Sequence, residues 1–235
     1  MLSVSGLSVE IEGVKVLRGV ALALAPGRAT MLVGRNGAGK TTTLRAVMGL
    51  VPRTAGTIAL GDVDLDRLPA NARARHGIGY APEDRRLIGE FTVERNVLLP
   101  AIAIAMPREE RRRRLEEVYD LLPQVAAMRA RPGGGTSGGQ GKMVALARAL
   151  MVADRVLLLD EPFQGLAPAL ALDYARTLAR LKAARGSMAI LVTESSPKLL
   201  GAIADETLVI ERGEIVAGPA GTSSAPDPDA PSRGR

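Results

Sequence analysis

A glycine-rich segment near the N-terminus, GRNGAGKT, carries the residue types of a phosphate-binding loop. It fits the pattern G-x-x-x-x-G-K-[ST] and lies between a strand-like run at 29–33 and a predicted helix. Glycines let the backbone wrap around phosphate oxygens at a helix N-terminus, which attracts anions. Lys40 would reach the outer phosphates of a nucleotide, and the Thr41 hydroxyl would bind Mg²⁺. The predicted nucleotide-binding residues of this segment are Gly34, Arg35, Asn36, Gly37, Ala38, Gly39, Lys40, Thr41 and Thr42.

Two adjacent carboxylates close an apolar run later in the chain. Residues 155–159, RVLLL, are followed by Asp160 and Glu161. A buried strand followed by two carboxylates can supply the acidic residues that a phosphoryl-transfer site needs in addition to its phosphate loop. Asp160 would hold Mg²⁺, and Glu161 would polarise the attacking water as general base. A strand ending in Asp-Glu is common by itself, so this prediction depends on the phosphate loop that precedes it.

The elements that must position these residues alternate between strand and helix. Strand patterns cover 2–11, 14–24 and 30–33, and the glycine-rich loop then opens a helix. The pattern is helical from about 85 to 153. A strand at 155–159, a helix at 169–184 and a strand at 188–193 follow, so we predict an α/β fold with a parallel sheet, an N-terminal antiparallel β segment and an inserted helical subdomain. The segment 221–235 is rich in Gly, Ser, Pro, Ala, Asp and Arg, which predicts a disordered tail.

Composition excludes several classes of protein. The absence of cysteine rules out a disulfide scaffold, a thiolate metal site and a cysteine nucleophile, and an aromatic content of 2% argues against stacking on single-stranded nucleic acid. The net charge of +6 is mild, and acidic residues interleave with arginines at 107–122, so we predict a solvated helix face and no nucleic-acid partner. The longest apolar stretch, 97–106, covers about half of the ~20 residues that a membrane span needs. Any membrane role therefore requires a partner chain.

A third motif lies between the phosphate loop and the acidic pair. Residues Thr136, Ser137, Gly138, Gly139 and Gln140 resemble the signature motif of ATP-binding-cassette (ABC) ATPases, and an apolar helix at 143–151 follows them. The resemblance runs from about residue 2 to 218. It implies a P-loop NTPase ABC ATPase fold over 1–220, with a RecA-like core at about 1–84 and 154–220 and a helical subdomain at about 85–153. It also implies ATP hydrolysis with ATP and Mg²⁺, in a head-to-tail pair where the signature of one ATPase caps nucleotide held by the other.

Shorter stretches are similar to one subfamily, the ATP-binding subunits of branched-chain amino-acid and urea importers. These stretches are YAPEDRR, FTVERN, ARALM and GLAP, which begin at 80, 91, 147 and 165. The resemblance implies two transmembrane permease chains, a solute-binding protein, and uptake of a small polar solute from a peripheral position on the cytoplasmic face of the inner membrane. Glu83 stands where most members have a glutamine that senses nucleotide. Its carboxylate can still ligate Mg²⁺ or water, and residues 83–92 are the expected coupling surface.

Several positions depart from the family pattern. Ile11 occupies the place of the aromatic residue that usually stacks on adenine, Thr136 that of the signature leucine, and Ala167 that of an aspartate. The family's switch histidine corresponds to Glu194, whose ionised carboxylate would repel a nearby phosphate. We therefore expect Glu194 to be turned away or protonated, hydrolysis at this chain's own site to be slow, and the second ATPase subunit to be non-identical.

Other interpretations are left open by the sequence. One is an ABC-type ATPase without a transport role, acting on DNA or ribosomes, although such chains usually fuse two cassettes or carry coiled-coil arms. Another is a nucleotide-binding partner that hydrolyses poorly in a heteromeric pair. A P-loop kinase is a weaker rival, because a kinase has no use for the signature-like segment at 136–140. The single histidine, His76, has no second histidine or acidic cluster at metal-ligand spacing and is interpreted as a surface residue.

Overall fold

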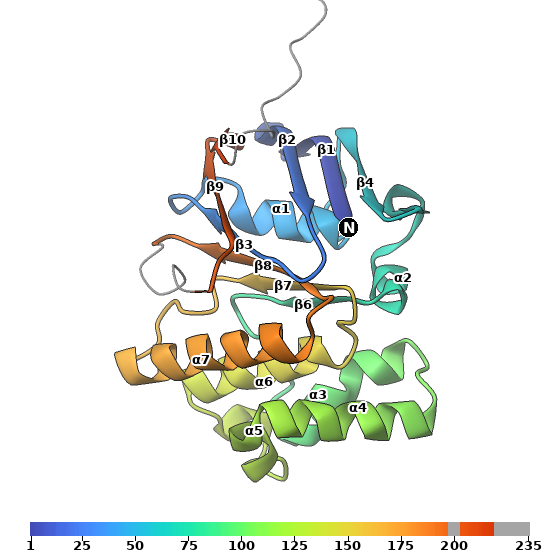
Figure 1. Cartoon of the computed structure of the whole chain (residues 1–235), viewed down its shortest axis with the longest axis vertical. Helices are drawn as coiled ribbons and strands as arrows, with labels where there is room; N and C mark the ends of the chain where they lie inside the picture. Colours follow the sequence, from blue (N-terminus) through green and yellow to red (C-terminus); the bar gives the residue numbers. More distant parts are fainter. Residues whose placement is uncertain (197–202, 219–235) are drawn as a thin grey trace, which may run out of the picture.

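The computed structural model describes residues 1–196 and 203–218, so the predicted tail at 221–235 lies outside the described residues (Figure 1). Its strands form a four-stranded sheet in the order β2-β1-β4-β5 and a six-stranded sheet in the order β10-β9-β3-β8-β7-β6. The strands are β1 (Leu2–Ile11), β2 (Val14–Leu24), β3 (Ala29–Val33), β4 (Ala55–Leu60), β5 (Val63–Asp64), β6 (Ile78–Ala81), β7 (Val156–Asp160), β8 (Ala189–Glu194), β9 (Glu206–Glu211) and β10 (Glu214–Ala217). The α-helices are α1 (Lys40–Val47), α2 (Ala70–Arg73), α3 (Val93–Ala103), α4 (Arg108–Leu121), α5 (Pro123–Ala127), α6 (Gly138–Leu150) and α7 (Pro168–Ala184).

The four-stranded sheet is antiparallel, as the N-terminal pattern predicts. β1 pairs with β2 on one side and with β4 on the other, and β4 continues to β5. Alternate residues of β1 point into the core, for example Leu2, Val4, Leu7 and Val9, with a shift of one position where the pairing is irregular after Val4. This half-buried pattern is typical of an antiparallel sheet with one face on the core.

The six-stranded sheet is parallel apart from its edge strand β10, which pairs antiparallel with β9. All five residues of β7 are buried. Leu157 and Leu159 belong to the core that the helical layer covers, whereas Val156 and Leu158 belong to the core between the two sheets. A strand that is buried on both faces needs no alternation, which explains the unbroken apolar run before Asp160.

Helices cover the six-stranded sheet on both sides (Figure 1). The first helix, α1, lies between the two sheets, and its Leu44 and Val47 join the core that contains β1, β2 and β3. Helices α3, α4, α5, α6 and α7 lie on the opposite face and share the second core with β7 and β8. Met143 and Met151 of this layer are buried, as their helical spacing predicts, and His76 is partly exposed.

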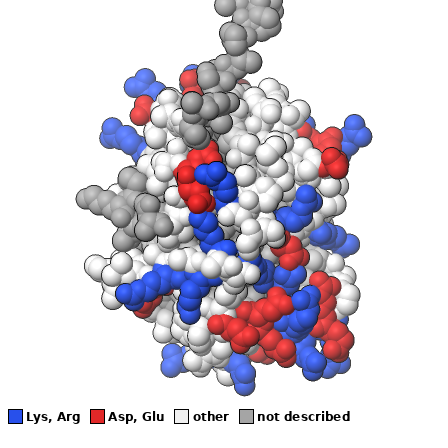
Figure 2. All heavy atoms as spheres, viewed as in Figure 1, with Lys and Arg blue, Asp and Glu red and all other residues white. Residues whose placement is uncertain are grey.

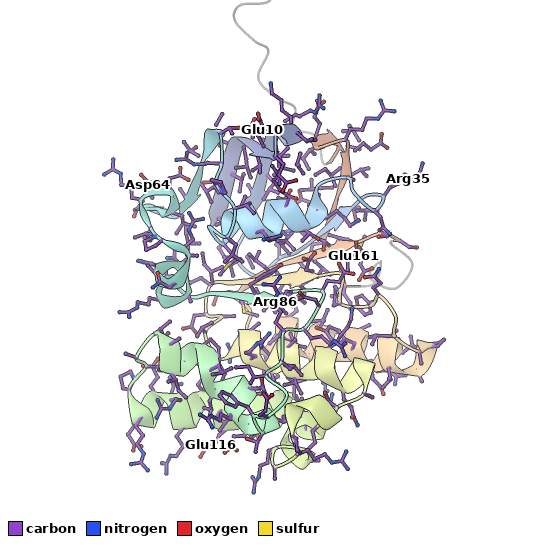
Figure 3. All side chains as sticks on the ribbon, turned by 180° about the vertical axis from the view of Figure 1, so that it is seen from behind. Glu10, Arg35, Asp64, Arg86, Glu116 and Glu161 are labelled. Atoms are coloured by element: carbon purple, nitrogen blue, oxygen red, sulfur yellow. The ribbon has the colours of Figure 1, made fainter. Side chains whose placement is uncertain are left out.

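The parallel register brings three strand ends to one edge. Val33 at the end of β3 pairs with Glu194 at the end of β8, and Asp160 at the end of β7 pairs with Thr193. Because ligands of open parallel sheets bind outside the carboxyl ends of the strands, this edge is where a site is expected. Figure 3 shows Arg35 and Glu161 on this side of the molecule.

The surface carries charges of both signs. In Figure 2 acidic and basic side chains interleave over the region of α4, where Arg113 and Glu117 form an ion pair at 2.7 Å and Arg112 lies 3.6 Å from Glu109. These pairs are exposed and one helical turn apart, as on a solvated helix face. Within residues 1–196 and 203–218, no helix combines the length and apolar character that crossing a bilayer requires.

Candidate functional site at the carboxyl edge of the parallel sheet

The glycine-rich loop connects β3 to α1 and closes on a buried lysine. Gly39 precedes the helix with φ of 112°, a left-handed conformation that glycine adopts without strain, and no side chain caps the helix there. Gly34 lies so close to β9 that an added Cβ would stand 2.4 Å from the carbonyl oxygen of Ile210. Lys40 is 3% exposed, and its Nζ donates to the carbonyl oxygens of Gly34 at 2.6 Å and Arg35 at 3.1 Å. The loop is therefore held around the lysine in a shape ready for an anion.

Asp160 accepts hydrogen bonds from three hydroxyl groups, each on a different helix or strand. Its Oδ1 accepts hydrogen bonds from Thr41 Oγ1 at 3.0 Å and Thr193 Oγ1 at 2.9 Å, and its Oδ2 accepts one from Tyr80 OH at 3.1 Å. Burial raises the pKa of Asp160, and the bonds from Thr193, Thr41 and Tyr80 oppose this shift because they favour the ionised form. The predicted pair Thr41 and Asp160 is thus already in contact.

The oxygen donors at this point fit Mg²⁺. Magnesium is usually held by one or two carboxylates together with substrate phosphates and water, so a hydroxyl and a carboxylate 3.0 Å apart are sufficient protein ligands. Glu83, the third predicted ligand, lines the same cavity as Thr41, and burial together with the charges of Glu161 and Asp160 raises its pKa. Among the described residues, no group of three or more His, Cys, Asp or Glu side chains could hold a metal ion without a substrate.

Glu161 faces the buried lysine from the end of β7. Its Oε1 lies 3.0 Å from Lys40 Nζ, and its backbone takes φ of 41°, which is strained for a residue with a side chain. The backbone N–H of Glu161 donates to Thr193 at 3.2 Å (to O) and 3.1 Å (to Oγ1), and Lys142 Nζ donates to the Glu161 carbonyl oxygen at 2.5 Å. Such strain is kept where the surrounding contacts determine it, as they do here.

A cavity of about 300 Å³ lies between the glycine-rich loop, Glu83 and Glu161. Its size suits the phosphate part of a nucleotide rather than a whole nucleotide in an enclosed pocket. Ile11, predicted near the adenine, lies outside this lining and is 39% exposed at the end of β1. The lining consists of Val16, Asn36, Gly37, Gly39, Lys40, Thr41, Thr42, Glu83, Glu161 and Gln164.

Glu194 is turned away from this cavity. Its carboxylate Oε1 accepts a hydrogen bond at 3.0 Å from the backbone N–H of Phe163, and the residue is 7% exposed. Burial raises the pKa of Glu194 to about 7; the neighbouring charge of Glu161 adds to the shift, and the Phe163 bond and two lysines oppose it. The expectation that this carboxylate is turned away or protonated agrees with this geometry.

The segment 136–140 begins α6 and is separate from the cavity around Lys40. Ser137 caps the helix, and its side chain and that of Gln140 bond reciprocally to each other's backbone N–H at 3.3 and 3.0 Å. Thr136 Oγ1 donates to the Gly133 carbonyl at 2.7 Å, whereas Gly138 is exposed and Gly139 buried. Gly139 and Gln140 line a different groove, between α5, α6 and α7. Within one chain, the structure does not bring this motif to the phosphate loop.

A further arginine holds the segment after β6. Arg148 of α6 donates to the carbonyl oxygens of both Arg85 and Arg86, the second at 2.7 Å. Arg85 and Arg86 have φ of 61° and 50°, so two consecutive residues with side chains take the left-handed conformation. An added Cβ at Gly141 would lie 3.0 Å from Arg85 Cδ, so a side chain at that position would require Arg85 to shift.

Several residues of the site escape the sequence analysis. Tyr80, Thr193 and Lys142 contact Asp160 or Glu161, and Ser195 contacts Lys40 and Glu161. Thr193 ends the strand beside β7 in parallel register, but the sequence does not give the strand order that makes these strands neighbours. Tyr80 lies in the YAPEDRR stretch, yet no pattern in the sequence indicates that it, Lys142 or Ser195 contacts the carboxylates, and only the folded chain brings them together.

Comparison with known proteins finds relatives that align with nearly the whole chain. Residues 17–164 match the family model described as ABC transporter. The chain is 33% identical over 217 residues to the lipopolysaccharide export system ATP-binding protein LptB of Escherichia coli K12, which covers 92% of this chain and 89% of that protein. It is 36% identical over 221 residues to the Fe(3+) ions import ATP-binding protein FbpC 2 of Rhodococcus jostii, with coverage of 91% and 60% respectively.

Two solved structures are similar over nearly the same length. One is an ATP-binding subunit of an ABC transporter, 26% identical, with a TM-score of 0.79 and coverage of 93% of this chain and 89% of that chain. The other is MJ1267, an ATP-binding cassette in its ADP conformation, 25% identical, with a TM-score of 0.80 and coverage of 95% and 92%. The two-sheet core and the helical layer are therefore shared with these cassettes.

Proposed function

We propose that this chain, which belongs to the ABC transporter family and is an ATP-binding, ATP-hydrolysing subunit of a transporter, powers the movement of a small polar solute across a membrane. The observation that carries the proposal is the convergence of Lys40, Thr41 and Glu161 on one cavity, with Asp160 bonded to Thr41 at 3.0 Å. The phosphate loop, the acidic pair and the signature-like segment agree with the family in order and spacing.

Each site residue has a role in this proposal. Lys40 neutralises the phosphate charge, and the backbone N–H groups of residues 34–42 hold the phosphate oxygens. Thr41 and Asp160 hold Mg²⁺ with Glu83 beside them, and Mg²⁺ when bound neutralises charge on the outer phosphates. Glu161 takes a proton from the attacking water; to do so its carboxylate must leave the ion pair with Lys40, which the phosphates then replace.

The segment 136–140 acts on a second ATPase subunit. It starts a helix of 13 residues and lies apart from this chain's own phosphate cavity, so a head-to-tail pair would bring it to nucleotide on the partner. Glu194 is bonded to Phe163 rather than aimed at the phosphate side, which supports slow hydrolysis at this chain's own site. We therefore retain the proposal that the partner is non-identical.

Membrane coupling is proposed at the segment after β6. A groove of about 500 Å³ runs beside it and is lined by Arg45, Leu50, Pro82, Asp84 and Arg86 among others. Figure 3 shows Arg86 at the boundary between the sheets and the helical layer. In this arrangement residues 83–92 bind the transmembrane chains. The helices at 85–153 form a subdomain beside a core at 1–84 and 154–220. The subunit lies peripherally on the cytoplasmic face of the inner membrane.

The solute is proposed from subfamily resemblance. The stretches at 80–86, 91–96, 147–151 and 165–168 favour branched-chain amino-acid or urea uptake, with a solute-binding protein as a further partner. Identity of 33% to LptB, a lipopolysaccharide export ATPase, favours a second candidate, export of a lipid-linked glycan. Cargo is selected by chains outside this sequence, so partner identity decides between the two.

The test is affinity purification of the full chain from gently solubilised native membranes, with co-purifying proteins identified by mass spectrometry. Two multi-span chains with a second ATPase and a solute-binding protein support the uptake proposal. Multi-span chains with lipid-transfer proteins and no solute-binding protein favour the export candidate. Recovery with ribosomal or DNA-bound proteins, or without membrane chains, would contradict both and favour an ABC ATPase without a transport role.

A further inference from the structure

Ser195 places a hydroxyl between the phosphate loop and the two catalytic candidates. Its Oγ lies 2.8 Å from Asn36 Oδ1 and 3.3 Å from Lys40 Nζ. The same atom lies 3.1 and 3.3 Å from the two carboxylate oxygens of Glu161. Ser195 is the first residue after β8, and no motif in the sequence points to it. A single hydroxyl thus contacts the loop, the lysine and the proposed general base.

Strand geometry explains why Ser195 rather than Glu194 occupies this place. Successive residues of a strand point to opposite faces, so residues 193 and 195 share a face and residue 194 has the other. Thr193 Oγ1 contacts Asp160, and Ser195 Oγ contacts Glu161. Glu194 faces the opposite way and bonds to the backbone N–H of Phe163. The end of the strand and the residue that follows it therefore present two hydroxyl groups to the two carboxylates.

Nucleotide binding would change what holds Glu161. In this structure its carboxylate contacts Lys40 at 3.0 Å and Ser195 at 3.1 Å. When Lys40 engages phosphate oxygens, as the proposed function requires, that ion pair is lost. A hydroxyl has one proton to donate, and it can pass from Asn36 Oδ1 to Glu161 by rotation about one bond. Ser195 then remains the side-chain donor next to the carboxylate.

We propose that Ser195 is a positioning residue for ATP hydrolysis. Its hydroxyl orients the Glu161 carboxylate toward the attacking water, a position that the Glu194 side chain does not occupy because it faces Phe163. This inference rests on the proposed role of Glu161 as general base. Ser195 transfers no proton itself. Loss of its hydroxyl should misplace the base by a fraction of an ångström to an ångström, and such misplacement lowers rates by up to about 10²-fold.

The test compares ATP hydrolysis by variants of the full chain in its native membrane complex. Ser195→Ala should lower kcat at this chain's own site about 10- to 100-fold and leave KM for ATP within about threefold, because ATP is held by the phosphate loop. Ser195→Thr should restore most of kcat, whereas Ser195→Val, of nearly the same shape, should not. The matched control is Ser196→Ala, the next position along, which should hydrolyse ATP as the natural chain does.

Three outcomes would overturn the inference. One is an unchanged kcat in Ser195→Ala, another is equal kcat in the Thr and Val variants, and the third is a rise in KM without a fall in kcat. The last would mean that Ser195 only supports the phosphate loop through Asn36. Glu161→Gln, assayed beside them, separates this inference from the proposed function: full activity in Glu161→Gln would refute the role of Glu161 itself.

Discussion

The helices α1 and α6 both begin in glycine-rich segments, yet their N-termini are equipped differently. At α1 no side chain caps the helix. The buried Lys40 pairs there with Glu161, and the neighbouring Thr41 bonds to Asp160. At α6, Ser137 and Gln140 cap the helix reciprocally, and Gly138 is exposed. The α1 terminus therefore leaves its backbone N–H groups for a ligand and has charged side chains around it. At the α6 terminus, side chains of the helix itself bond to two of the backbone N–H groups.

The difference shows how much of a catalytic site each terminus contains. An anion at α1 would meet a lysine, a hydroxyl and carboxylates within one cavity. An anion at α6 would meet backbone dipoles and the Ser137 hydroxyl, with the phosphate loop of the same chain elsewhere. In the proposed function, the α1 terminus is one nearly complete site for phosphoryl transfer. The α6 terminus is then half a site, which nucleotide on another chain would complete.

The largest effect should come from removing the proposed base at the α1 terminus. Glu161→Gln keeps the shape of the side chain but cannot accept a proton, so we expect kcat at this chain's own site to fall about 10²- to 10⁴-fold while ATP still binds. ATP turnover and binding of labelled ATP, measured on the same preparation, separate the two quantities. Glu214→Gln, on exposed β10, controls for loss of one carboxylate. If Glu161→Gln kept full turnover, the α1 terminus would not be a hydrolytic site.

The second prediction tests whether the two termini belong to one composite site. Lys40→Ala should disable the α1 terminus and Ser137→Arg should block the α6 terminus, each lowering turnover at least tenfold at the composite site to which that terminus belongs. If two copies of this chain pair head to tail, mixing the two variants restores part of the activity, because one site of each mixed pair contains both intact halves. With a non-identical partner, mixing restores nothing.

The mixing experiment has a built-in control. Two preparations of the Lys40→Ala variant, mixed in the same way, should stay inactive. Recovery after mixing the two different variants would refute the non-identical partner and keep the head-to-tail arrangement. Full activity of Ser137→Arg alone would refute the role of the α6 terminus.

The sequence alone predicts the α1 terminus better than its surroundings. The phosphate loop is local in sequence, so its strand, turn and helix are legible from eight residues, and Asp160 and Glu161 follow from the apolar run before them. The antiparallel N-terminal segment and the parallel core are also as expected from periodicity. Strand order in the parallel sheet is a property of long-range packing, so the pairing of Asp160 with Thr193 could not be derived.

The residues that the sequence analysis missed share this cause. Tyr80, Thr193 and Ser195 reach the carboxylates from β6 and β8, which flank β7 in space but are distant in sequence. Their side chains are common polar types without a motif. Glu194 is different: the sequence analysis expects its carboxylate to be turned away or protonated, and the alternation of the strand directs it to the backbone N–H of Phe163.

The smallest predicted effect concerns Glu194, a buried carboxyl group near the α1 terminus. The pKa of Glu194 is about 7 in the folded chain, against 4.5 ordinarily. Between these values the folded chain holds a proton that the unfolded chain has lost, so this group's contribution to stability is complete below about pH 4.5 and is lost as pH rises through 7. The full effect corresponds to about 3 kcal/mol.

Glu194→Gln removes this titration while its amide oxygen can still accept from Phe163 N–H. The variant should match the natural chain near pH 5 and exceed its free energy of unfolding by about 2 kcal/mol near pH 8.5, as measured by urea denaturation at both values. The difference in free energy of unfolding between the two chains cancels the titration of the groups that they share. Glu214→Gln is the control for loss of an exposed carboxylate. A difference that stays constant with pH would mean that Glu194 is not held in a buried, proton-binding environment, and the contrast between the two helix termini would then rest on their hydrogen bonds alone.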